Sequence, residues 1–214
     1  TDIFRYSLGV NAGFQPGVMK GSSNNTKGVD FTMSYRKQRV TVGANINLTE
    51  TSGNNSPYGD FSAFRQANPY YRMTNDDGTY DQILDNFTAA GSTTVTNPLY
   101  NSNIGIKDLQ RSLSIASSLN FEYMILDNLR LTESLQYTRG TARTEKFLPA
   151  NHTSFANETD KTLKGSYSKN TGESTSWSSN LGLNYNLPIN KHLISMLANW
   201  TVSEDRNNYV NLSA

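Results

Sequence analysis

The sequence contains no cysteine among its 214 residues, so disulfide frameworks, cysteine-based zinc sites and thiol nucleophiles are excluded. It also lacks any run close to the roughly 20 apolar residues that a transmembrane helix needs. The net charge is only +1, which leaves no basic footprint for binding nucleic acid. No signal peptide opens the sequence. We therefore expect the N-terminus to be either mature or cut from a longer chain.

Apolar residues are scarce, but aromatic residues are not. Hydrophobic residues make up 36% of the chain and the mean hydropathy is −0.59, whereas aromatic residues reach 11% and include twelve tyrosines. This composition fits a sheet that is apolar on one face and wet on the other. Both a membrane β-barrel and a solvated all-β binding protein have such sheets.

Alternation with a period of two is the dominant pattern. Between Phe4 and Phe14 every even position is apolar, and every odd position is polar or glycine. These eleven residues match the about 9–11 residues of a tilted strand that crosses a bilayer. The same pattern predicts seven strands, at 4–14, 29–35, 40–48, 113–123, 129–137, 177–187 and 194–202.

The connections between these strands alternate in length. Tight turns are expected near 36–39, 126–128 and 188–191, and long connections at 15–28, about 50–108 and about 140–174. Outer-membrane barrels have short periplasmic turns and long extracellular loops. We therefore predict an all-β fold of antiparallel up-and-down strands that forms part of a transmembrane β-barrel, with about seven of the full set of strands.

Some residues at the alternate positions that are otherwise apolar need a separate explanation. Seven aromatic residues lie near the expected strand ends and predict membrane-interface girdles, although aromatic residues are also good strand formers in general: Tyr6, Phe14, Tyr35, Tyr123, Tyr137, Tyr185 and Trp200. Glu133 breaks the apolar parity. A bulge at Glu133, a position near an interface or contact with a neighbouring chain would each explain it.

Five motifs occur in an order that closely resembles the SusC/RagA family of TonB-dependent outer-membrane transporters of Bacteroidetes. They are PGVMKGS at 16–22, SPYGDFS at 56–62, NPYYR at 68–72, DDG at 76–78 and NPLY at 97–100. The resemblance runs from about residue 4 to 100, and beyond it only the strand-and-loop pattern continues.

The resemblance implies a barrel of about 22 strands filled by an N-terminal plug. It also implies a SusD-like surface lipoprotein as partner, energy supplied through TonB, and import of oligosaccharides or peptides. Residues 1–214 would then be a fragment of the barrel domain in the bacterial outer membrane, in contact with lipid, with plug and TonB box absent. This function needs no enzyme activity and no cofactor.

The expected ligand or partner site lies on the longest connection. Its candidate residues are Tyr58, Phe61, Phe64, Tyr70, Tyr71 and Arg72. Aromatic rings stack on sugars or peptide side chains, and an arginine pairs with carboxylates. The alternative is that these residues pack the loop itself or face the lipoprotein, because a long loop needs an internal core to be ordered.

No motif predicts a catalytic or metal site. The Asp-rich run at 75–81 lacks the EF-hand spacing and reads as an Asp-Gly turn, with calcium in another geometry as the alternative. His152 and His192 have no partner spacing for a metal. Two other functions stay open from the sequence: a soluble all-β glycan-binding module and a passive porin-like barrel.

Overall fold

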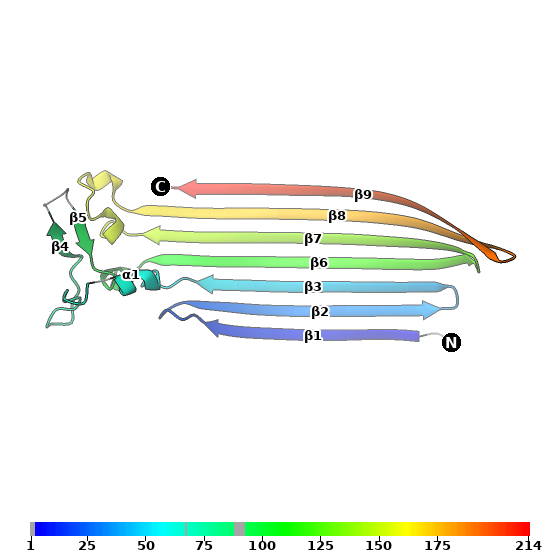
Figure 1. The fold of residues 1–214 in the computed structure, drawn as a ribbon, viewed down its shortest axis with the longest axis horizontal. Helices are drawn as coiled ribbons and strands as arrows, with labels where there is room; N and C mark the ends of the chain where they lie inside the picture. Colours follow the sequence, from blue (N-terminus) through cyan, green and yellow to red (C-terminus); the bar gives the residue numbers. More distant parts are fainter. Residues whose placement is uncertain (1–2, 67, 88–92) are drawn as a thin grey trace.

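The computed structural model describes residues 3–66, 68–87 and 93–214, and strands account for 68% of these residues. The predicted all-β, antiparallel up-and-down fold is confirmed, because seven long strands form one sheet and follow one another in chain order (Figure 1). These strands are β1 (Ile3–Pro16), β2 (Ser23–Lys37), β3 (Val40–Asn54), β6 (Lys107–Leu126), β7 (Leu129–Leu148), β8 (Ser166–Ile189) and β9 (His192–Ser213).

One end of the sheet carries only tight turns. Two residues separate the strands in each hairpin, and they are Gln38–Arg39, Asp127–Asn128 and Asn190–Lys191. Gln38 and Asn190 adopt positive φ angles of 46° and 54°, which close such short connections. Neighbouring turns are also joined, since the Arg39 guanidinium lies 2.8 Å from an Asp127 carboxylate oxygen.

The two faces of the sheet differ because side chains alternate along each strand. One register row joins Tyr6, Met33, Ala44, Leu119 and Leu135, and the adjacent row on the other face contains Ser, Thr, Asn and Gln. We call these the apolar face and the polar face.

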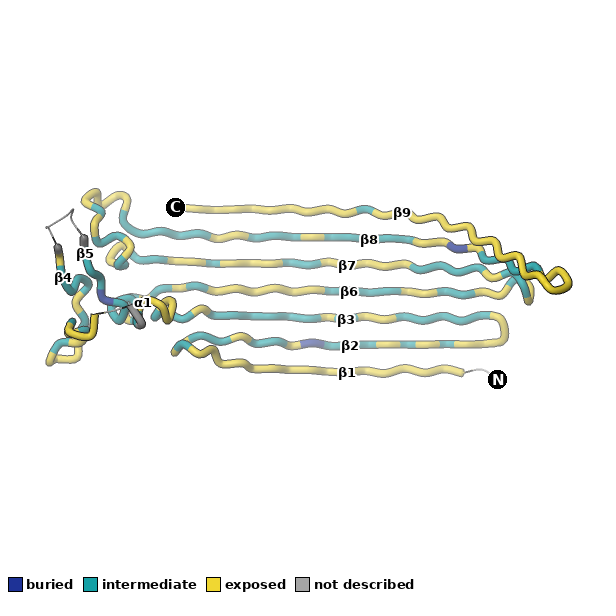
Figure 2. Tube along the Cα trace, viewed as in Figure 1, coloured by how far each residue is buried: buried dark blue, intermediate teal, exposed yellow. Residues whose placement is uncertain are grey.

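No described part of the chain covers the apolar face. Among the residues that the structure describes, no hydrophobic side chain is buried. The edge strands β1 and β9 are exposed along almost their whole length (Figure 2). The described residues form only one further sheet, made of β4 (Ile83–Phe87) and β5 (Thr93–Thr96), and Figure 1 places it at the loop end. The described residues therefore form no sandwich that would bury the apolar face internally.

The strands are longer than predicted, and the long connections are correspondingly shorter. The connections are 17–22, 55–106 and 149–165, instead of 15–28, about 50–108 and about 140–174. The missed parts are the loop-proximal ends of the strands, such as Thr138–Leu148 of β7. Both faces are polar there, so the alternation that reveals a strand fades while the backbone pairing continues.

The longer strands also place the aromatic residues more exactly along the sheet. Tyr35, Tyr123 and Tyr185 lie near the turn end of the apolar face, as a girdle requires. Tyr137 is not near a strand end. It lies midway along β7, opposite Trp177 of β8, at the level where the apolar face becomes charged.

The strand register excludes one of the three explanations for Glu133, the bulge. Glu133 pairs regularly with Phe121 on one side and Leu181 on the other, so a bulge at this residue is wrong. Its carboxylate accepts a 2.6 Å hydrogen bond from the Ser179 hydroxyl on the same face. Glu133 lies four residues beyond Leu129, the first residue of β7, which is close to the turn end.

The loop end is the more elaborate end of the molecule. Besides β4 and β5 it carries α1 (Phe61–Gln66) and the short 3-10 helices η1 (Tyr100–Asn103), η2 (Thr153–Phe155) and η3 (Lys161–Leu163). No helix in the described ranges is long and apolar enough to cross a membrane.

Candidate functional site

The long loops at the loop end are bonded to one another, and together we call them the loop cap (residues 17–22, 55–66, 68–87, 93–106 and 149–165). The first contact joins two of the sequence motifs. The Ser56 hydroxyl donates a 2.7 Å hydrogen bond to the Lys20 carbonyl, and Asn54 donates one to the Gly21 carbonyl. Gly21 has a φ of 83°, and a Cβ there would lie 3.0 Å from the Pro57 ring. The sequence PGVMKGS therefore needs glycine at this position.

Asn97 holds the middle of the loop cap together. Its side chain is completely buried, donates to the Met73 carbonyl at 2.8 Å and accepts from the Leu99 amide at 3.0 Å. Its backbone amide donates to the Gln82 carbonyl, and its own carbonyl accepts from Tyr100. One asparagine thus fixes the NPLY segment against the end of the NPYYR segment.

The loop at 149–165 is joined to the loop segments between 55 and 106 by hydrogen bonds of side-chain amides and hydroxyls. Asn101 donates to the Thr153 hydroxyl at 2.6 Å and accepts from the Thr153 backbone amide at 3.1 Å. Thr94 donates to Asn157 at 2.5 Å. Gln82 donates to the Asn151 carbonyl at 2.9 Å. These polar contacts join segments that lie more than 50 residues apart in the sequence, and they give the loop cap a defined shape.

A hollow of about 420 Å³ opens between these segments. Its walls combine aromatic and aliphatic side chains with hydroxyls and an amide, and the lining includes Tyr58, Tyr71, Leu84, Val95, Asn101 and Thr153. Apolar walls with a few polar groups are typical of ligand sites. The arrangement suits binding of a small or extended ligand by stacking and hydrogen bonding.

Tyr71 has the clearest chemical setting in this hollow. Its hydroxyl donates a 3.0 Å hydrogen bond to the Asp85 carboxylate on β4. Burial raises the pKa of the Tyr71 phenol, and the Asp85 hydrogen bond and negative charge act in the same direction. The phenol therefore stays protonated and keeps one acceptor position for a further partner.

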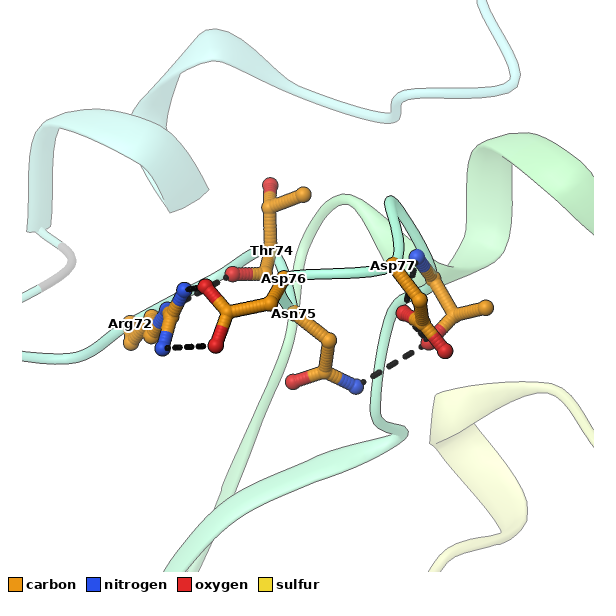
Figure 3. Close-up of polar contacts among 6 residues, drawn as sticks. Arg72, Thr74, Asn75, Asp76 and Asp77 are labelled. Atoms are coloured by element: carbon orange, nitrogen blue, oxygen red, sulfur yellow. Dashed lines mark hydrogen bonds and ion pairs between the residues drawn. The ribbon is translucent and has the colours of Figure 1, made fainter.

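Arg72 and the Asp-rich run form a local turn, shown in Figure 3. The Arg72 guanidinium makes a forked ion pair with Asp76 and donates to the Thr74 carbonyl at 3.1 Å. Asp77 instead accepts from the Thr79 amide at 2.9 Å and the Thr79 hydroxyl at 2.6 Å, and Gly78 takes a positive φ of 83°.

The predicted Asp-Gly turn is thus confirmed. The carboxylates of Asp76 and Asp77 face different partners, as Figure 3 shows. In the part of the chain that the structure describes, no group of three or more His, Asp or Glu side chains lies close enough together to hold a metal ion.

The six predicted site residues do not form one cluster. Tyr58 and Tyr71 line the hollow. Phe61 and Tyr70 are 64% and 93% exposed, while Phe64 is half-buried on α1. Arg72 already has a carboxylate partner. That these six residues form a ligand or partner site stays a prediction, and in the structure Arg72 pairs with Asp76 of its own loop.

Other residues of the hollow were not foreseen. Asn101 and Thr153 come from different loops, and no local pattern connects them. His152 next to them caps η2 by accepting from the Ser154 amide. Burial lowers the pKa of His152, and the positive charge of Lys146 lowers it further, so this imidazole is neutral near pH 7.

Comparison with known proteins gives a likeness in fold. No protein-family model matches the chain, and neither does any curated protein. The fold is similar to that of chains in solved RagAB structures. The RagAB peptide transporter gives a TM-score of 0.73 at 14% identity, over 99% of this chain and 24% of that chain.

Two states of the RagAB peptide importer give similar values. The "closed-closed" state has a TM-score of 0.74 at 15% identity, and the "open-open" state has 0.69 at 15% identity. They cover 99% and 98% of this chain, and 24% and 23% of the matched chains. The chain therefore spans about a quarter of the length of the proteins it resembles, and the likeness is one of fold.

Proposed function

We propose that this chain is a wall segment of an outer-membrane β-barrel transporter related to SusC/RagA proteins. The observation that carries the proposal is the uncovered apolar face of a single up-and-down sheet whose long loops gather at one end. In water such a face would be strongly unfavourable, whereas in a bilayer it meets hydrocarbon. The likeness in fold to RagAB chains supports the same assignment.

Residues 1–214 would supply seven strands of the barrel domain. The unpaired edges of β1 and β9 support further strands on both sides, because exposed backbone groups cannot remain unsatisfied in lipid. The polar face, rich in Asn, Ser, Thr and Gly, then faces the lumen. The loop cap lies outside the cell, as long loops do in such barrels.

The loop cap is the proposed meeting point with substrate and partner. Tyr58 and Tyr71 offer ring faces inside the hollow, and Phe61 and Tyr70 present exposed rings for a SusD-like lipoprotein. The solved relatives in fold are described as peptide transporters, so peptides come first among the substrates to test, followed by oligosaccharides.

Uptake by cells tests this function. Cells with and without the protein are given labelled peptides or oligosaccharides, before and after an uncoupler discharges the inner-membrane potential. TonB-dependent import predicts uptake that requires both the protein and the energised membrane. Uptake that persists unchanged with the uncoupler would instead identify a passive porin.

A further inference from the structure

The apolar face changes character towards the loop end. There it carries seven cationic side chains and four carboxylates, which we call the charged band: Lys27, Lys107, Arg111, Arg139, Arg143, Lys169, Arg206, Glu50, Glu145, Glu173 and Glu204. All of them share the side-chain parity of the apolar residues below them. The change begins at the level of Tyr137 and Trp177, which are opposite each other in register.

Two arginines of the charged band are direct cross-strand neighbours. Arg111 of β6 pairs in register with Arg143 of β7, and both line a hollow of about 300 Å³ together with Glu50, Leu113 and Thr141. Like charges placed directly opposite each other destabilise a sheet unless an anion lies between them.

Only one of these arginines is neutralised. Glu50 bonds to Arg111, with its Oε1 at 2.7 Å from Nε and 2.5 Å from a terminal guanidinium nitrogen. Among the residues that the structure describes, Arg143 has no ion pair and no side-chain hydrogen bond. The hollow thus has an excess positive charge and a free guanidinium fork, with the Thr141 hydroxyl beside it.

The position of the hollow along the strand can be compared with a bilayer. From Tyr123 to Leu113, the apolar side chains of β6 span ten residues, or about 34 Å along the strand. A tilt of about 40° reduces this length to about 26 Å along the membrane normal, close to the apolar band of about 25 Å in such barrels. Arg111 follows two residues later, about 5 Å higher, which is headgroup level.

We propose that the Arg111–Arg143 hollow binds the phosphate groups of lipids in the outer leaflet of the outer membrane. This inference rests on the proposed membrane location. Guanidinium groups bind phosphate oxygens in a forked geometry, and Arg143 is free to do so. Leu113 lies in the same hollow and the apolar belt follows directly below it, so acyl chains continue where the phosphate ends. A lipid satisfies both features, whereas free phosphate satisfies only the first.

The test uses the full protein reconstituted in phosphatidylcholine nanodiscs that contain diphosphorylated lipid A as the probe. Native mass spectrometry measures how much lipid A stays bound. The R111Q/R143Q variant is compared with R5Q/R36Q, which removes the same charge from the opposite face. The single variant R143Q touches no internal contact and keeps the test decisive if the double variant folds poorly.

We expect R111Q/R143Q and R143Q to bind lipid A about tenfold more weakly, the loss expected for one charge-assisted contact, and R5Q/R36Q to bind it as the unmodified protein does. Equal retention by R143Q and the unmodified protein would overturn the proposal. Complete displacement of lipid A by inorganic phosphate would overturn it too, because the occupant would then be the free anion. Insertion into nanodiscs is scored separately. Failure to insert contradicts the membrane location, whereas insertion without an arginine effect contradicts the lipid site alone.

Discussion

At the scale of single residues, buried polar side chains decide how the loop cap is ordered. Asn97 is the clearest case, since it is fully buried and its amide group satisfies two backbone groups from different segments. A buried polar group left without a partner costs about 1–3 kcal/mol. The order of the cap therefore depends on a few such residues rather than on a hydrophobic core.

Asn97→Ala should loosen the loop cap without unfolding the sheet. The Met73 carbonyl and the Leu99 amide would lose their partner, which should lower the local stability by about 1–3 kcal/mol. Faster backbone hydrogen exchange at 68–87 and 93–106 would report this loss. Asn86→Ala, at an exposed position of β4, is the matched control, and equal protection in both variants would contradict the role of Asn97.

The pKa of the Asp77 carboxyl should depend on its hydrogen bonds with Thr79. Hydrogen bonds from the Thr79 hydroxyl and amide hold the pKa of the Asp77 carboxyl below its ordinary value of 3.8. A lowered folded pKa means that the stabilisation of the turn is present above 3.8 and is lost as pH falls through the folded pKa.

Thr79→Val removes the hydroxyl donor, so the pKa of Asp77 should rise towards 3.8, as measured by carboxyl ¹³C NMR titration. Asp160 has the same arrangement with Thr162 in the other long loop. Thr162→Val should therefore shift Asp160 and leave Asp77 unchanged. An Asp77 pKa that is unaffected by Thr79→Val would refute this cause.

At the scale of elements, the polar face of the first three strands is held by a side-chain network. The Asp30 carboxylate accepts hydrogen bonds from Asn11 and Asn47, and Thr49 donates to Asn47 at 3.1 Å. This network links β1, β2 and β3 across the face that we assign to the lumen. Space for it exists because Gly28, opposite Asn11 in register, has no side chain.

Gly28→Ala should destabilise the β1–β2 pair. A Cβ at this position would collide with the Asn11 amide and displace it from Asp30, and the loss of such a hydrogen bond costs about 0.5–1.5 kcal/mol. The midpoint of unfolding in guanidinium chloride should fall accordingly. Gly13→Ala on β1 of the same face meets nothing within 4 Å and should leave the midpoint nearly unchanged. A larger effect of Gly13→Ala than of Gly28→Ala would contradict this role of the network.

Strands could be predicted from the sequence where apolar and polar residues alternate strongly. The turn-proximal halves of all seven strands were predicted because apolar side chains alternate with polar ones there, as from Phe4 to Phe14. Apart from β1, the loop-proximal parts of the strands were missed because residues such as Thr138–Leu148 are largely polar on both faces. The β4–β5 hairpin was missed because its short strands carry no distinct period.

The residues of the candidate site could be predicted only in part, because some of their contacts depend on turn geometry and tertiary structure. Tyr58 and Tyr71 were foreseen from the motifs that carry them. The pairing of Arg72 with Asp76, four residues ahead, was not predicted because it depends on the geometry of the turn. Asn101 and Thr153 meet only through tertiary structure, which no local pattern encodes.

At the scale of the whole molecule, the central feature is a single sheet with an uncovered apolar face, a polar face and a loop cap at one end. None of the described hydrophobic side chains is buried, so the sheet depends on its surroundings for the burial that normally drives folding. A bilayer on one side and a closed barrel lumen on the other would provide these surroundings. Adjacent side chains of the central strand β6 then lie in opposite environments, one in lipid and the next in the lumen.

Spin labels at Leu119 and Ser118 of β6 test this claim most directly. The two positions are adjacent, lie at nearly the same depth and have strand partners on both sides. In the reconstituted protein, the account predicts that the label at Leu119 is relaxed by oxygen dissolved in the lipid, and the label at Ser118 by a water-soluble nickel complex. Equal access of the nickel complex to both labels would contradict the assignment of the apolar face to the membrane.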